Sequence, residues 1–117
     1  MHLQITFRDI PHSDAVEGHV ARLSAKLERL HERIVVCRVV VAVPHRRHHH
    51  GKRYRCQVEV IVPGGELVVG GNPPERLDLE DMHAAIDAAF DDVDRMLREH
   101  ASRLRERRKV TSRAARR

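Results

Sequence analysis

Four short stretches of the chain have the hydrophobic pattern of β-strands. Residues 3–8 and 54–62 alternate between apolar and polar side chains, which predicts strands with one buried face. Residues 34–43 are β-branched almost throughout, which predicts a central strand that ends at Pro44. After a Pro-Gly-Gly turn, residues 66–69 predict a short fourth strand.

A segment between the first two strands repeats apolar residues at the spacing of an α-helix. Its apolar stripe consists of Val16, Val20, Leu23, Leu27 and Leu30. Either Ser13 or Asp14 can cap the start of this helix, which we expect to run to about Leu30.

A second helical stripe begins at Met82 and ends at Leu104, which predicts a helix that runs to about Arg107. The glycines and prolines of residues 70–81 predict a loop before it. Residues 109–117 are basic and lack apolar periodicity, so they are expected to form a disordered tail.

These elements predict an α+β fold with the order β-α-β-β-β-α. The last three strands should form an antiparallel meander, and the first should lie parallel to a neighbour because a helix follows it. Each helix has one apolar stripe, so both should cover the same face of a four-stranded sheet in a two-layer sandwich. The chain of 117 residues fits one domain, residues 1–108, followed by the tail. The uncovered face of the sheet should carry Gln4, Thr6, Arg8, Arg38, Arg55, Gln57 and Glu59.

Positive charge is concentrated near the C-terminus. The chain contains 22 Lys and Arg residues against 17 Asp and Glu, a net charge of +5. Residues 95–117 contain ten basic and two acidic residues, which leaves residues 1–94 with twelve basic and fifteen acidic ones. Such a basic arm is typical of proteins that bind a polyanion, most plainly nucleic acid. A solvated, frayed tail is the alternative interpretation.

Hydropathy and cysteine usage exclude some classes of protein. No apolar run approaches the roughly 20 residues that cross a bilayer, so we expect neither an integral membrane protein nor a membrane partner. The alternating N-terminus lacks the continuous apolar stretch of a signal peptide, and the chain has two cysteines, so a reducing cytoplasm is expected. Cys37 and Cys56 lie on predicted strands and should be buried free thiols.

Enzymatic chemistry has little support in the sequence. No serine has the flanking glycines of a nucleophile elbow, and the Pro-Gly-Gly turn does not precede a helix as a phosphate-binding loop does. Asp91, Asp92 and Asp94 splay around a helix and cannot form a carboxylate dyad. Three pairs have the i, i+4 spacing of ordinary surface ion pairs: Asp91–Arg95, Asp94–Arg98 and Glu99–Arg103. We therefore expect no catalysis, no cofactor and no small-molecule substrate.

Basic residues on the two predicted helices are a stronger signal. Arg22, Lys26 and Arg29 share one flank of the first helix because of their i, i+4, i+7 spacing. One row of the second helix contains Arg95, Arg98 and Arg105. Two helices side by side on a sheet would bring both rows to one surface, which could hold RNA through its phosphates. The alternative is a solvated face of Lys and Arg.

Residues 45–52, His-Arg-Arg-His-His-His-Gly-Lys, are predicted to form a basic loop. Arg46 and Arg47 could contact phosphates there. His45, His48 and His50 could approach one metal ion only if the loop folded back, and no cysteine lies nearby to complete a zinc site. An exposed loop without a metal is therefore the expectation.

Nearly the whole chain, from Leu3 to about Leu104, resembles the bacterial hibernation-promoting factors, the ribosome-associated translation inhibitors once called sigma-54 modulation proteins. The segments that carry the resemblance are LQIT (3–6), AKLER (25–29), VPGGEL (62–67) and EDMHAAID (80–87). The last two segments, at this separation and after this order of elements, are its specific part.

The resemblance implies a domain similar to double-stranded-RNA-binding folds that binds the small ribosomal subunit near the decoding region. Such proteins overlap the positions of mRNA and tRNA and silence idle 70S ribosomes under starvation or stress. The chain looks like the short form of the family, without an additional dimerisation domain. Lys26, Arg29 and Arg95 match basic positions of the family. Departures from the family pattern are Asp92 and Glu99, where relatives have lysine, and His83, where tyrosine is usual.

The first hypothesis is therefore a cytoplasmic ribosome-hibernation factor that is not an enzyme. Lys26, Arg29 and Arg95 would hold phosphates of 16S rRNA, and further contacts would come from Arg22, Arg98, Arg46 and Arg47. A second hypothesis is a diverged member that acts as a protein-interaction or metal-responsive module through the loop 45–52. A third is a general binder of duplex RNA.

Overall fold

The computed structural model of the chain describes residues 1–43, 54–70, 78–79 and 81–115. Its strands are β1 (His2–Arg8), β2 (Val36–Ala42), β3 (Tyr54–Val62), β4 (Gly65–Val69) and β5 (Asp78–Leu79), and its helices are α1 (Asp14–Leu30) and α2 (Met82–Ala115). The order of the long elements confirms the predicted β-α-β-β-β-α succession. The two-residue strand β5 lies where the sequence predicted only a loop.

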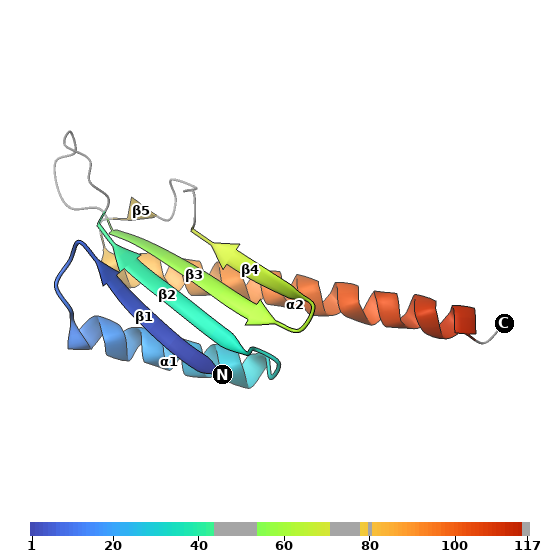
Figure 1. The fold of residues 1–117 in the computed structure, drawn as a ribbon. Coiled ribbons are helices and arrows are strands. Elements are labelled where there is room, and N and C mark those ends of the chain that lie inside the picture. Colours follow the sequence, from blue (N-terminus) through green and yellow to red (C-terminus); the bar gives the residue numbers. More distant parts are fainter. Residues whose placement is uncertain (44–53, 71–77, 80, 116–117) are drawn as a thin grey trace.

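The sheet has the order β1-β2-β3-β4, and β5 pairs with the start of β3 (Figure 1). β1 is parallel to β2, whereas β2, β3 and β4 form an antiparallel meander, as predicted. Both helices lie on one face of the sheet, with α1 next to β1 and α2 across β3 and β4 (Figure 1). The predicted two-layer α+β sandwich is therefore confirmed.

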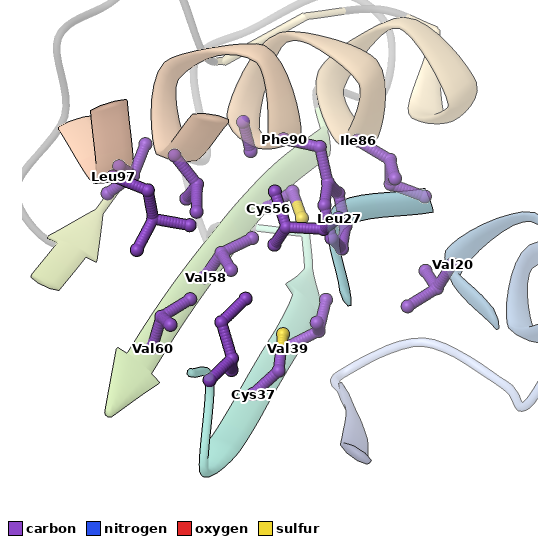
Figure 2. Packing of buried hydrophobic residues seen from close by; sticks show 14 of the residues in the cluster. Val20, Leu27, Cys37, Val39, Cys56, Val58, Val60, Ile86, Phe90 and Leu97 are labelled. Atoms are coloured by element: carbon purple, nitrogen blue, oxygen red, sulfur yellow. The ribbon is translucent and has the colours of Figure 1, made fainter. Parts of the chain in front are cut away.

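The core between the two layers consists almost wholly of aliphatic side chains (Figure 2). Every second residue of β2 and β3 points into it, because side chains alternate between the two faces of a strand. These fully or almost fully buried strand residues are Cys37, Val39, Val41, Cys56, Val58, Val60 and Val62. Burial raises the pKa of the Cys37 thiol to about 11 and that of Cys56 to about 12, so both are protonated at neutral pH. The expectation of two buried free cysteines is confirmed.

Helix α1 has well-defined ends. Ser13 is the N-cap, and its Oγ accepts a hydrogen bond from the Val16 N–H at 3.3 Å. At the other end the His31 N–H donates to the Leu27 carbonyl at 2.9 Å. The buried residues Val16, Val20, Ser24 and Leu27 form one stripe, so the opposite side of α1 faces solvent.

The face of the sheet away from the helices carries polar side chains, as predicted. Arg38 donates from Nη1 to Glu59 Oε1 at 2.6 Å and from Nε to Gln4 Oε1 at 3.2 Å. This contact follows from the register, which places Gln4, Arg38 and Glu59 opposite one another on adjacent strands. Hydrogen bonding to Glu59 and repulsion by its charge raise the pKa of Glu66. Arg38 thus links the polar side chains of three adjacent strands on this face.

Helix α2 is longer than predicted and projects past the end of the sheet (Figure 1). In place of the disordered tail expected for residues 109–117, residues 109–115 continue the helix, and residues 116–117 lie outside the described residues. Apolar periodicity fades after Leu104 because no sheet remains there to pack against. The helix continues because arginine, lysine and alanine are strong helix formers and no glycine or proline follows Pro74. Neither helix has both the length and the hydropathy that a membrane span requires.

Candidate nucleic-acid interface

Helix α1 presents three cations on its solvent-facing side. Arg22, Lys26 and Arg29 are all exposed, opposite the stripe that packs on the sheet. Among the residues that the structure describes, none of the three forms an ion pair. We call these three residues the α1 cation row. Glu28 lines the same hollow as Arg22 and Arg29, but because none of the three cations is held in an ion pair by a described residue, the row is available to an external anion.

The arginines of the middle of α2 have a different environment, because each pairs with a carboxylate on the same helix. Arg95 Nη2 lies 3.4 Å from Asp92 Oδ1, and Arg103 Nη2 lies 3.6 Å from Glu99 Oε2. Arg98 pairs with Asp94. The predicted pairs of Arg98 and Arg103 are therefore confirmed, whereas Arg95 uses Asp92 at i, i+3 instead of the predicted Asp91.

Histidine–carboxylate contacts join α1 to α2. His19 Nε2 lies 2.7 Å from Asp87 Oδ1, and His31 Nε2 lies 2.7 Å from Asp94 Oδ1. The ring of His83 packs edge-on against His19, with a distance of 4.7 Å between the ring centroids. We call this line of contacts the interhelical seam. It fixes the two helices side by side, and it was not predicted.

Asp94 belongs to both sets of contacts. Its partial burial would raise its pKa, but hydrogen bonds from His31 and Arg98, together with their charges, hold the pKa of Asp94 below its usual value. Asp94 is therefore ionised at neutral pH and partly neutralises Arg98. The side chain after it, Arg95, lies about 100° further around the helix and is exposed.

The structure thus brings the two helices together as predicted, and the two basic rows differ in their ion pairing. Two carboxylates of α2, Asp87 and Asp94, lie in the seam, where they contact His19 and His31. Arg105, the third residue of the predicted α2 row, lies further along α2 and is exposed. The predicted contact residues Arg46 and Arg47, and the weak metal candidates His45, His48 and His50, lie outside the described residues.

A second concentration of cations lies on the part of α2 that projects past the sheet. Its basic residues Arg105, Arg107, Arg108 and Lys109 are exposed, and Glu106 is the acid among them. This projecting segment begins beside the C-terminal end of α1, where the cation row ends (Figure 1). The helix layer therefore has carboxylates near the start of α2 and mostly cations at its other end, which is a surface suited to a polyanion such as RNA.

The described residues contain one cluster of metal-ligating type. His12, Asp14 and Glu17 bring their ligand atoms within 4.8 Å of one another, and all three are exposed. Both ring nitrogens of His12 already face a carboxylate, Nδ1 that of Asp14 and Nε2 that of Glu17. These contacts between the histidine ring and the two acids account for the arrangement without a metal.

Comparisons with known proteins agree with this fold. A family model described as "Sigma 54 modulation protein / S30EA ribosomal protein" matches residues 3–105. The N-terminal domain of Protein Y from Thermus thermophilus is similar, with a TM-score of 0.67 and 24% identity over 86% of this chain and 99% of that chain. A ribosomal subunit interface protein from Coxiella burnetii has a TM-score of 0.68 and 15% identity over 87% of this chain and 99% of that chain. No curated protein matches the sequence.

Proposed function

The chain belongs to the Sigma 54 modulation protein / S30EA ribosomal protein family, and from this premise we propose that it binds the small ribosomal subunit and inhibits translation on idle ribosomes. The family is one of ribosome-associated proteins and not of enzymes, in agreement with the expectation from sequence. The proposed binding region is the decoding region, where mRNA and tRNA lie, and the proposed partners are 16S rRNA and 70S particles in the cytoplasm under stress or in stationary phase.

The observation that carries this proposal is the α1 cation row. Three exposed cations on a rigid helix, without carboxylate partners among the described residues, can replace the counterions of RNA phosphates. Their binding is favourable because the released counterions gain entropy, and it needs no particular base sequence. The projecting segment of α2 adds positive charge beside the end of the row.

Arg95 and Arg98 are proposed to play a smaller role than the α1 row. Each must leave or share a carboxylate, Asp92 or Asp94, before it can contact a phosphate. The cost of breaking such a pair offsets part of the gain from the new contact. The resemblance gave Arg95 the same weight as Lys26 and Arg29, whereas the geometry supports a greater weight for α1.

The proposed mechanism is occlusion and not chemistry. The domain measures 64 × 27 × 17 Å along its principal axes, so it is a thin, elongated body. Its sheet, buried valine core and interhelical seam hold the helices in fixed positions. A body of this kind, held by phosphate contacts in the decoding region, would exclude mRNA and tRNA without any change in covalent structure.

Co-sedimentation with ribosomal particles from stationary-phase extract tests the proposal. We expect the protein to pellet with 30S and 70S particles at low salt and to be released as salt increases. Failure to pellet at low salt would contradict the proposal. In a competition experiment, plain duplex RNA and added free ribosomes are compared for how well each displaces the protein from the pelleted particles. Equally effective displacement by the two would instead indicate the general duplex-RNA binder. The alternative of a module acting through the loop 45–52 concerns residues outside those described, and no observation on the described residues favours it.

A further inference from the structure

A cavity of about 320 Å³ lies where the end of α1 meets α2 and the end of β3. Residues 29–34 form one wall, Val62 and Pro63 form the floor, and α2 closes the other side with residues from Leu97 to Leu104. Its volume is at the lower end of the range of small-ligand pockets. It is therefore large enough for one small planar group and too small for a folded element.

The interior of this cavity is apolar and its edge is cationic. Leu30, 57% exposed, and Leu104 contribute aliphatic surface on opposite sides. Arg29, Glu32 and Arg33, all exposed, lie at the edge, where the two arginines outweigh the single glutamate. Because Leu30 is so exposed, its apolar surface has no packing partner among the described residues. This surface lies next to two guanidinium groups that can bind phosphate.

His100 adds an unsatisfied polar atom to the cavity lining. Its Nε2 is buried and has no hydrogen-bond partner among the described residues. The ring packs closely on Gly65, where a Cβ would lie only 3.2 Å from the His100 Cε1. A buried ring nitrogen without a partner is unfavourable, and a ligand with a polar edge could satisfy it once the ring turns towards the cavity.

We infer that this cavity receives one unstacked nucleobase of the bound RNA, while Arg29 and Arg33 hold the flanking phosphates. The inference rests on the proposed function and names what the end of the α1 cation row recognises. Proteins recognise single-stranded RNA by placing a splayed base against apolar or guanidinium surface and bonding to its polar edge. Leu30 and Leu104 supply the apolar surface, and His100 supplies the polar contact.

Charge and continuity favour a nucleotide over a protein segment as the occupant. Arg29 lines the cavity and also ends the α1 cation row, so a strand whose phosphates follow Arg22 and Lys26 arrives at its entrance. Every nucleotide has a phosphate close to its base. It can therefore place the base in the apolar interior while its phosphates contact the two arginines at the edge. An acidic peptide with a leucine side chain is the competing occupant, and the experiment below separates the two.

The test uses the full chain and two short single-stranded RNAs, one with a 2-aminopurine and its twin with an abasic site at the same position. We expect the RNA with 2-aminopurine to bind about tenfold more tightly than its abasic twin, since one base stacked on protein contributes on this order. The Ala101→Leu variant fills the cavity and should bind both RNAs with the affinity of the abasic twin. His100→Phe keeps an aromatic side chain but removes the ring nitrogens, so it should lose part of the difference. Ala15→Leu, the same change at an exposed site at the start of α1, should retain the full difference.

Equal affinity of the wild-type chain for both RNAs would overturn the inference, as would an unchanged difference in Ala101→Leu. The inference would also be wrong if an acidic, leucine-containing peptide, and not the RNA, shifted the His100 ring resonances. Ribosome pelleting reports on the proposed function separately. A base-dependent affinity together with no pelleting would leave the cavity assignment in place and contradict the ribosomal role, and the reverse result would contradict only the cavity assignment.

Discussion

The two helices carry cations in different electrostatic environments. The α1 cation row faces solvent without ion-pair partners among the described residues. The carboxylates of α1 contact other groups: Glu28 the N-terminal amine, and Asp14 and Glu17 the ring of His12. In the middle of α2, by contrast, Arg95, Arg98 and Arg103 each have a carboxylate within one turn.

This difference shows that the number of basic residues on a helix does not measure its capacity to bind a polyanion. Formal charge counts the two sets of three cations as equal. An arginine that already pairs with a carboxylate contributes less net field, and its transfer to a phosphate gains less free energy. The residues between the cations therefore decide which helix binds.

The largest expected effect follows from neutralising the α1 cation row. In the variant Arg22→Gln, Lys26→Gln, Arg29→Gln, affinity for the small subunit should fall on the order of 100-fold at low salt. The slope of log affinity against log salt should decrease by about 2 to 3, because up to three phosphate contacts are lost. Fluorescence titration of 30S particles over a range of salt concentrations measures both quantities.

A matched triple variant on α2, Arg95→Gln, Arg98→Gln, Arg103→Gln, removes the same formal charge and is the control. Its affinity should fall less than tenfold, and its salt slope should change by less than about 1. Equal losses in the two triple variants would show that pairing with Asp92, Asp94 and Glu99 does not matter. Circular dichroism should confirm that both variants keep the helical content of the native chain.

The second effect concerns Asp94, which contacts His31 at the end of α1 and Arg98 on α2. Asp94→Asn should lower the free energy of unfolding by about 1–2 kcal/mol at pH 7, because charge-assisted hydrogen bonds to His31 and Arg98 are lost. The pKa of Asp94 is lower in the folded chain than in the unfolded chain, so its contribution is complete above the unfolded value of about 3.9. The difference between wild type and variant should therefore shrink as the pH falls below about 4. Urea denaturation at pH 7 and at about pH 3 measures it.

Asp87→Asn is the matched control for this prediction. Asp87 makes the equivalent contact with His19 at the same 2.7 Å, but its side chain is 51% exposed against 19% for Asp94. Solvent screening should limit its cost to about 0.5 kcal/mol. A stability difference for Asp94→Asn that persisted at low pH would show that packing, and not charge, is responsible.

The fold could be predicted from local patterns because each element buries one face. The alternation in β1 and β3 and the stripe of α1 are visible over a few residues, and they also determine which side of the sheet the helices cover. The end of α2 could not be predicted from the apolar stripe. The stripe shows only which residues pack on the sheet, and the helix continues beyond the end of the sheet. Strand β5 is two residues long and has no periodicity to detect.

Only part of the candidate site could be predicted, because local patterns show which residues are exposed but not which residues of distant elements meet. The exposure of Arg22, Lys26 and Arg29 follows from helical spacing alone. The interhelical seam does not, since His31 and Asp94 are 63 residues apart and meet only because of how α2 is rotated about its axis. That rotation depends on side chains such as Ile86 and Phe90 packing on the sheet, which no local pattern encodes. A histidine on α1 and an aspartate on α2, each beside an apolar stripe, were the available signals.

The smallest effect expected is a gain of binding on α2. Glu99→Gln removes the partner of Arg103, and both side chains of this pair are more than half exposed, so stability should change by less than about 0.5 kcal/mol. Affinity for the small subunit should rise about two- to threefold, because Arg103 can then contact a phosphate without leaving a carboxylate.

Glu106→Gln removes the same charge from the projecting segment, where Glu106 forms no ion pair with another described residue. At about 0.15 M salt its long-range effect is screened beyond roughly 8 Å, so its gain should be smaller. Equal gains from the two substitutions would mean that the net charge of α2, and not the release of Arg103, limits binding.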